Sequence, residues 1–222
     1  KNAGVYPRSS SSFDTFSETY ISAANDIDLL VKWHHIEYED FFINEINYSG
    51  PFIENSVLEP WFSEDPWTKA LRHKKVLVIH PFTQSILQQY AKRKELFKDS
   101  DVLPEFDLQL YKAVQSSGLE SGPHESWLAS LTIMQNEISK LDFDVAIIGA
   151  GAYGLPLGSF IKSLMGKCAI HMGGISQILF GIKGKRWESV ERYQDLFNRH
   201  WTYPNEYEIP EGAKLIENGC YW

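Results

Sequence analysis

Three glycines with the spacing of a phosphate-binding turn are the first residues of this chain that could do chemistry. Gly149, Gly151 and Gly154 lie in the stretch "AIIGAGAYGLPLG", between an apolar run and a segment with helical spacing. Such glycines let a tight turn bring its backbone close to a phosphate group at the N-terminus of the next helix. Three interpretations follow: a dinucleotide site, a contact with a phosphate or sugar nucleotide, or a purely structural turn.

The segment that follows argues against a dinucleotide. The next predicted strand runs into His171, Met172, Gly173 and Gly174, and it has no Asp or Glu placed to bind a ribose hydroxyl. The turn also lies late in the chain, with too little regular structure after it for a second nucleotide-binding half. We therefore expect no NAD or FAD.

A glycine-spaced basic loop, "FGIKGKRW", is the second candidate site. Lys183, Lys185 and Arg186 fall within four positions and are followed by Trp187. Lysines supply point charges, arginine offers a bidentate fork for a phosphate, and the indole could stack on a base. The loop predicts diphosphate binding, and a solvated basic loop is the alternative.

Metal-binding and nucleophilic groups are harder to place. Asp26 and Asp28 have the Asp-x-Asp spacing of many sugar-nucleotide enzymes, but they begin an apolar stretch, which favours capping over metal binding. The stretch His34 to Asp40, "HHIEYED", offers further ligands without forming a specific metal signature. Neither a nucleophile elbow, nor a phosphate loop ending in Gly-Lys-Ser/Thr, nor a zinc pattern occurs, so the sequence identifies no catalytic group.

Composition narrows the classes of protein. The chain has 222 residues and a formal net charge of -8, which disfavours a broad nucleic-acid surface. Two cysteines are too few for a disulfide framework, and no apolar run is long enough to span a bilayer. We expect one reduced, cytoplasmic domain over residues 1–222; because the chain begins with Lys1, a segment could precede it.

Strands and helices alternate along the chain and would position these groups. Apolar runs predict strands over 26–33, 76–79, 108–116, 144–151 and 167–174. Helical spacing predicts helices over 13–25, 37–46, 84–97 with Thr83 as cap, 124–141, 153–165 and 187–201, with another starting near 176. Residues 1–12 read as a loop, and residues 188–222 as a C-terminal helix and a wrapping tail. The alternation predicts a Rossmann-like α/β fold, a mainly parallel sheet with helices on both faces.

Ligands of open α/β sheets gather beyond the carboxyl ends of the parallel strands. In this chain the rule selects four segments: 80–83, 115–118, 149–153 and 171–174. Within them and in the basic loop we take as candidate ligand-binding residues His80, Thr83, Gln115, Ser116, Gly149, Gly151, Tyr153, Gly154, His171, Gly173, Gly174, Lys183, Lys185, Arg186 and Trp187.

The chain resembles the GT-D-fold and GT-D-like glycosyltransferase domains of bacterial polysaccharide gene neighbourhoods. The similar segments are spread over about two thirds of the chain and are "WTKALRHKKVLVIHPF", "KAVQS", "DVAIIGAGAYGLPLGSFIK", "AIHMGGISQILFGIKGKRW" and "ENGCYW". The resemblance implies a domain that binds a nucleotide-diphosphate sugar and transfers the sugar to a saccharide acceptor, with Mn²⁺ or Mg²⁺ assisting the leaving diphosphate. Proven members carry an Arg-Tyr-Gly-Asp-Gly-Glu-like segment that serves the metal, which these residues lack; either it lies upstream of Lys1 or this branch does without it.

Three functions therefore stay open. The first is a glycosyltransferase whose diphosphate contacts the glycine turn and the basic loop. The second is a non-catalytic sugar-phosphate or nucleotide-binding module of a polysaccharide assembly protein. A dinucleotide-dependent oxidoreductase is the third and weakest reading.

Overall fold

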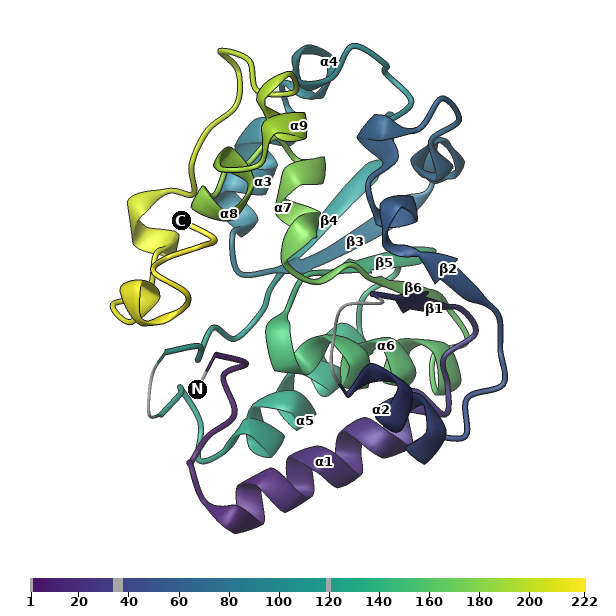
Figure 1. The fold of residues 1–222 in the computed structure, drawn as a ribbon, viewed down its shortest axis with the longest axis vertical. Helices are drawn as coiled ribbons and strands as arrows, with labels where there is room; N and C mark the ends of the chain where they lie inside the picture. Colours follow the sequence, from purple (N-terminus) through teal and green to yellow (C-terminus); the bar gives the residue numbers. More distant parts are fainter. Residues whose placement is uncertain (1, 34–37, 119–120) are drawn as a thin grey trace.

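A four-stranded parallel sheet forms the centre of the molecule. The computed structural model describes residues 2–33, 38–118 and 121–222. The strands pair in the order β4-β3-β5-β6 (Figure 1), with bounds β3 Lys75–His80, β4 Asp107–Lys112, β5 Val145–Ile148 and β6 Cys168–His171. All three pairings are parallel, so the predicted Rossmann-like α/β class is confirmed.

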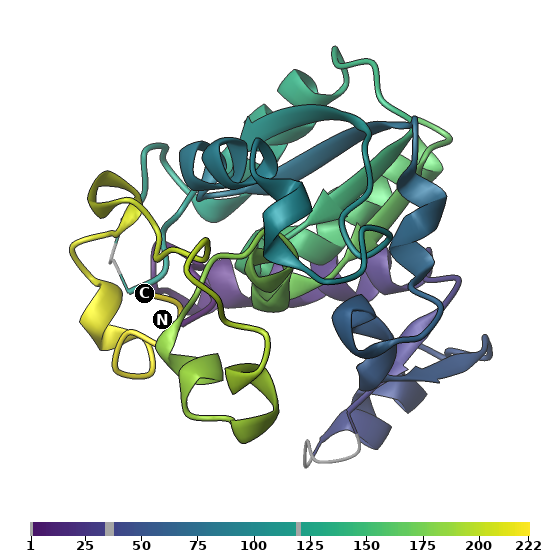
Figure 2. The same cartoon turned by 90° about the horizontal axis from the view of Figure 1, so that it is seen from above.

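Helices cover both faces of this sheet because its central strands are apolar on both sides. Val76 and Val78 pack with the helices of one face, whereas Leu77 and Ile79 pack with those of the other. Figures 1 and 2 show α5 and α6 on the second face with α1 outside them, and α3 and α7 on the first. Their bounds are α1 Ser10–Ala24, α3 Thr83–Tyr90, α5 Trp127–Ile138, α6 Gly154–Ser163 and α7 Ser176–Leu179.

Shorter elements complete the described chain. They are α2 Glu39–Glu45, α4 Arg93–Leu96, α8 Lys185–Glu188, α9 Glu191–Gln194, β1 Leu30–Lys32 and β2 Phe52–Glu54. The 3₁₀ helices are η1 Asn55–Leu58, η2 Pro60–Phe62, η3 Trp67–Leu71, η4 Gly151–Tyr153, η5 Gly173–Ile175, η6 Glu206–Glu208 and η7 Ala213–Leu215.

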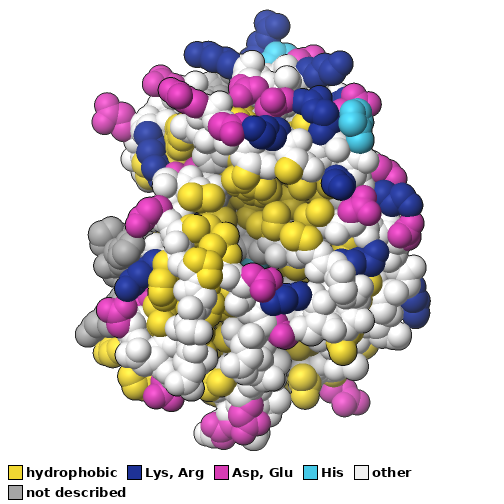
Figure 3. All heavy atoms as spheres, turned by 90° about the vertical axis from the view of Figure 1, so that its right-hand side faces the viewer, with side chains coloured by type: hydrophobic (Ala, Val, Ile, Leu, Met, Phe, Trp, Pro, Cys, Tyr) yellow, Lys and Arg dark blue, Asp and Glu magenta, His cyan; other side chains and the backbone are white. Residues whose placement is uncertain are grey.

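The prediction of a strand over 26–33 is wrong in the length of the strand and in the sheet to which it belongs. The observed strand β1 is only partly buried and pairs with β2, which the sequence did not predict, in a separate two-stranded sheet. Its flanking residues Leu29 and Trp33 are about half exposed. Figure 3 views the side of the molecule that carries this small sheet and shows hydrophobic side chains gathered around a hollow. The apolar run therefore forms a partly exposed strand at the surface of the molecule and not a strand of the central sheet.

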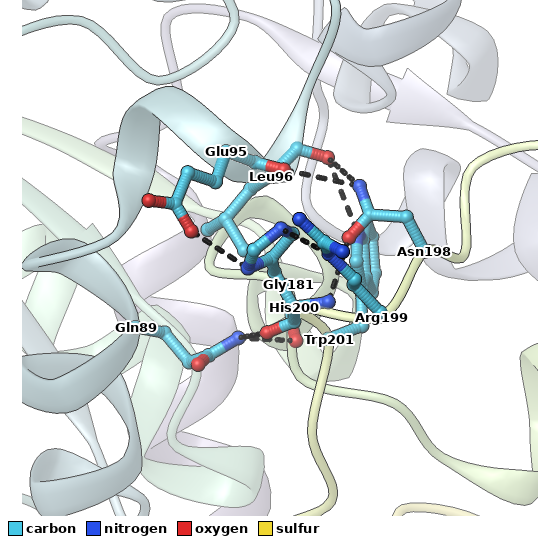
Figure 4. Close-up of polar contacts among 8 residues, drawn as sticks. All are labelled: Gln89, Glu95, Leu96, Gly181, Asn198, Arg199, His200 and Trp201. Carbon is cyan, nitrogen blue, oxygen red and sulfur yellow. Dashed lines mark hydrogen bonds and ion pairs between the residues drawn. The ribbon is translucent and has the colours of Figure 1, made fainter.

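The single helix predicted over 187–201 is also wrong. The structure has the two short helices α8 and α9, separated by extended backbone at Val190. Figure 4 shows why the chain leaves helical geometry beyond them. The Asn198 amide and the Trp201 indole N–H both donate to the carbonyl of Leu96, at 3.2 and 3.1 Å, and so tie this segment to α4. Buried Gln89 donates to the carbonyls of Gly181 and His200 at 3.0 and 2.9 Å.

Both ends of the chain are more deeply integrated than a loop and a wrapping tail. Val5 and Tyr6 of the N-terminal segment are buried, and α1 begins at Ser10, where the Ser9 hydroxyl accepts from the Ser12 N–H. The C-terminal segment contributes Ile216 and Trp222 to the core on the α3 face. Both terminal segments thus contribute side chains to the hydrophobic core.

One further correction concerns the start of α3. Thr83 was predicted to cap this helix but is its first residue, and no side chain of the N-cap residue bonds there. The cap comes instead from Glu208 in the C-terminal segment, as described below. In the part of the chain that the structure describes, none of the helices has the length and apolar content required to cross a membrane.

Candidate functional site

The candidate site lies where the connections of the sheet diverge. The chain leaves β3 for β4 on one side, while β5 lies on its other side. A switch point of this kind opens a crevice at the carboxyl ends of the strands. A cavity of about 110 Å³ occurs there, and we call it the strand-end pocket. Its lining is Asn2, Ala3, His80, Pro81, Phe82, Val114, Gln115, Ser116, Ser117, Gly149, Ala150, Gly151, Tyr153, Gly174, Gln177, Tyr221 and Trp222.

His80, the last residue of β3, is the only titratable imidazole of the pocket lining. Its side chain is 2% exposed, and burial lowers its pKa from 6.5 to about 3. The Phe82 N–H donates to His80 Nδ1 at 3.0 Å. Nδ1 is therefore an acceptor, and the proton of the neutral ring resides on Nε2. Nε2 donates to no described residue, and it is not fully buried, so a ligand in the pocket could accept this hydrogen bond.

The structure favours glycine at each of the three positions of the turn for a different reason. A Cβ at Gly149 would lie 2.1 Å from Ser176 Oγ and 2.5 Å from His80 Cδ2, so the glycine lets these buried groups approach β5. Gly151 has a φ of +53°, a conformation that side chains disfavour. A Cβ at Gly154 would lie 2.1 Å from His171 Nε2. Packing and backbone conformation account for the motif without a pyrophosphate.

The N-terminal segment and the loop after β4 form one wall of the pocket. Ser116 Oγ donates to the carbonyl of Gly4 at 2.6 Å and lies 3.3 Å from the Tyr153 hydroxyl. The Ala152 N–H donates to the carbonyl of Ala3 at 3.2 Å. Burial raises the pKa of Tyr153, so its hydroxyl stays protonated. Sequence reasoning predicted Ser116 and Tyr153 but missed the N-terminal part of this wall; the signal was Val5 and Tyr6, apolar residues inside a polar stretch.

The C-terminal residues form the facing wall, which sequence reasoning also missed. Tyr221 and Trp222 line the pocket, and the indole N–H of Trp222 is buried without a partner. Gln177, 1% exposed, donates to the carbonyls of Lys183 and Tyr221 at 2.9 and 3.1 Å. The aromatic pair at the end of "ENGCYW" was visible in the sequence, but its place beside the pocket depends on contacts more than 40 positions away.

The structure brings together only some of the predicted site residues. Each of the four strand-end segments contributes to the pocket lining, through His80, Gln115, Ser116, Gly149, Gly151, Tyr153 and Gly174. Besides Lys183, Lys185 and Arg186 of the basic loop, five predicted residues do not line it. These are Thr83, buried at the start of α3; Gly154 and His171, which pack on each other; Gly173 in η5; and Trp187, buried in the core.

The basic loop faces the C-terminal segment and not the pocket. Arg186 pairs with Glu217, and its guanidinium lies 4.7 Å from the ring centroid of Tyr221. The Lys183 ammonium lies 5.2 Å from the ring of Phe197, and Lys185 Nζ is 3.5 Å from the Asn218 carbonyl oxygen. None of these three cations belongs to the pocket lining. The contacts of Lys185 and Arg186 hold the wall that carries Tyr221.

The candidate metal ligands lie at the opposite end of the sheet. Asp26 accepts from Ser159 Oγ at 2.5 Å, which lowers the pKa of this carboxyl, and Asp28 pairs with Lys162 at 2.7 Å. His34, His35 and Glu37 lie outside the described residues. Within the described ranges, no three His, Cys, Asp or Glu side chains cluster as metal ligands would. Among the residues that the structure describes, no cluster of side chains therefore fits the divalent ion that the resemblance implies.

Comparison with known proteins adds no relative: no family model, no curated protein and no solved structure matches this chain.

Proposed function

We propose that this chain binds a nucleotide-activated sugar at the strand-end pocket, as a glycosyltransferase-like domain. The observation that supports the proposal is the Trp222 indole N–H, which is buried without a partner in the lining of the pocket, beside the neutral imidazole of His80 at the switch point of the sheet. A buried donor without an acceptor is costly, and a bound hydroxyl or carbonyl would satisfy it. Hydroxyl, amide and aromatic groups around it are those that recognise sugars and nucleosides.

A non-catalytic binding module is the second candidate, and one observation favours it. No Asp, Glu, Lys or Arg lines the pocket in the described chain, and His80 is held neutral by burial. These groups can bind and orient a sugar and shield it from water, but they offer no carboxylate to act as general base. Transfer would need an acidic group from elsewhere.

Calorimetry with UDP-, GDP-, CMP- and dTDP-sugars, each with and without Mn²⁺ or Mg²⁺, tests the binding proposal. His80→Asn removes the Nε2 donor while its amide oxygen can still accept from the Phe82 N–H. We expect about tenfold weaker binding in this variant, which is the value of one hydrogen bond. The matched control is His73→Asn, at an exposed histidine before the opposite end of β3.

The two candidates differ in turnover. Release of nucleoside diphosphate in the presence of saccharide acceptors would support transfer, and tight binding without release would support the module. If none of the sugar nucleotides binds the wild-type chain, the proposed function is wrong.

A further inference from the structure

As far as the structure describes its lining, the strand-end pocket has polar groups but no charged side chain. Its lining combines the amides of Gln115 and Gln177, the Ser116 and Ser117 hydroxyls and the neutral His80 imidazole with aromatic side chains. A phosphate or diphosphate in such a pocket would lose its hydration without meeting a cation, which costs several kcal/mol. An uncharged ligand loses much less.

The helix N-terminus nearest the end of β3 already holds an anion of the protein itself. The Glu208 carboxylate, 3% exposed, accepts from the N–H groups of Gln84 and Ser85 at 2.8 and 3.2 Å, and from Ser85 Oγ at 2.5 Å. In open α/β folds a ligand phosphate often takes this position. Here the carboxylate satisfies the helix and would repel a phosphate.

The nearest cations of the sequence motif are also engaged. Arg186 has Glu217 and Tyr221 as partners, and Lys183 lies against the rings of Phe197 and Tyr203. Binding a phosphate with them would require these contacts to be given up. Three features of the described residues therefore disfavour an anionic ligand: the uncharged pocket lining, the Glu208 carboxylate at the start of α3, and the engagement of Lys183 and Arg186 by other side chains.

The remaining features match a single sugar ring. The cavity volume of about 110 Å³ corresponds to about four water molecules at the density of the liquid, so the pocket encloses one small ring, and any larger part of a ligand would lie at its open mouth. Tyr221 and Trp222 supply the apolar wall that sugar faces require, and His80 Nε2–H supplies a donor for a hydroxyl oxygen.

We propose that the strand-end pocket binds an uncharged glycosyl ring, with His80 as hydrogen-bond donor and Tyr221 and Trp222 as its aromatic wall, while any diphosphate stays outside. This inference deepens the proposed function and rests on it for the identity of the bound molecule. It changes the role expected for the basic loop, which positions the aromatic wall and does not bind the ligand.

Amide chemical shifts of the ¹⁵N-labelled chain test the proposal. The probes are the methyl glycosides of glucose, galactose, mannose and N-acetylglucosamine, together with inorganic phosphate, pyrophosphate and UDP, each at about 50 and 500 mM NaCl. We expect at least one glycoside to shift the amides of Ala150 and Gly151, with a Kd that changes less than twofold with salt. Screening weakens the binding of an anion much more.

Two variants link the shifts to the proposed contacts. His80→Asn and Trp222→Leu should each weaken glycoside binding about tenfold, whereas His73→Asn should leave it unchanged. Comparison of the amide spectra of the variants establishes that each one is folded. The proposal is overturned if no glycoside shifts the pocket amides, or if phosphate, pyrophosphate or UDP shifts them in a salt-dependent way.

Failure of this inference differs from failure of the proposed function. If a sugar nucleotide binds without shifting the pocket amides and is insensitive to His80→Asn, the function stands and the glycosyl-ring inference is wrong. If methyl glycosides bind in the pocket but no sugar nucleotide binds at all, the inference stands and the proposed function is wrong.

Discussion

Replacing His80 with asparagine should change how the stability of the protein depends on pH. The imidazole is buried and neutral in the fold, with a pKa lowered to about 3 by burial, whereas its ordinary value is 6.5. Between these two values the unfolded chain binds the proton and the folded chain does not. The contribution of His80 to the free energy of unfolding is therefore undiminished above about pH 6.5 and falls as the pH drops toward 3.

The size of the effect follows from the same two pKa values. Each pH unit between them is worth about 1.36 kcal/mol. Lowering the pH from about 8 to about 5 should therefore remove roughly 2 kcal/mol of stability from the wild-type protein through His80 alone. Asparagine does not titrate, so His80→Asn should lose about 2 kcal/mol less over the same range.

Urea unfolding followed by tryptophan fluorescence at both pH values measures this difference. His73→Asn, which removes an exposed imidazole outside the pocket, is the control and should follow the wild type. If the stability difference between wild type and His80→Asn is the same at both pH values, the imidazole is not buried in its neutral form and the account of the pocket given above fails.

Three further predictions concern packing and capping. Gly149→Ala should cost about 2–4 kcal/mol in urea unfolding, because its Cβ meets buried Ser176 and His80 within 2.5 Å. Gly158→Ala inside α6, where the added Cβ would meet no atom closer than 3.8 Å, should instead stabilise by about 0.5–1 kcal/mol, and equal effects would contradict the packing argument. Glu208→Ala should cost about 2–4 kcal/mol by leaving donors of α3 without an acceptor, and Glu208→Gln about half as much; a neutral Glu208→Ala would refute the capping role. Gln89→Leu should cost about 1–3 kcal/mol and speed amide exchange in residues 199–202, and unchanged exchange would show that this side chain does not hold the segment.

The central sheet could be predicted because its signal is local. The run of apolar, β-branched residues from Val76 to Ile79 and the similar run before Gly149 are buried on both faces, as parallel strands between helices must be. Helical periodicity located α5 and α6 to within a few residues. Once the strands are parallel, their carboxyl ends share one edge, so the nearness of His80 and Gly149 follows from topology.

The small sheet and the C-terminal region could not be predicted in this way. Nothing local distinguishes the apolar run that forms β1 from one that enters the core, because its strand partner β2 and its exposure are set by packing. The segment after α9 has helical periodicity, but Asn198 and Trp201 find carbonyl acceptors about 100 positions earlier in the chain. Tertiary hydrogen bonds overrode the local preference.

The sequence by itself determined the class of fold, the edge of the sheet at which the strand-end pocket lies, and the presence of His80 and Gly149 at that edge. Only the tertiary structure decided the character of the pocket. It turned Lys183 and Arg186 toward the C-terminal segment, placed Glu208 at the start of α3, and brought Tyr221 and Trp222 to the pocket wall. The physical reason is that charge and hydrogen-bond partners are chosen in space, between residues far apart in the chain, whereas periodicity reports only what neighbours in sequence can form.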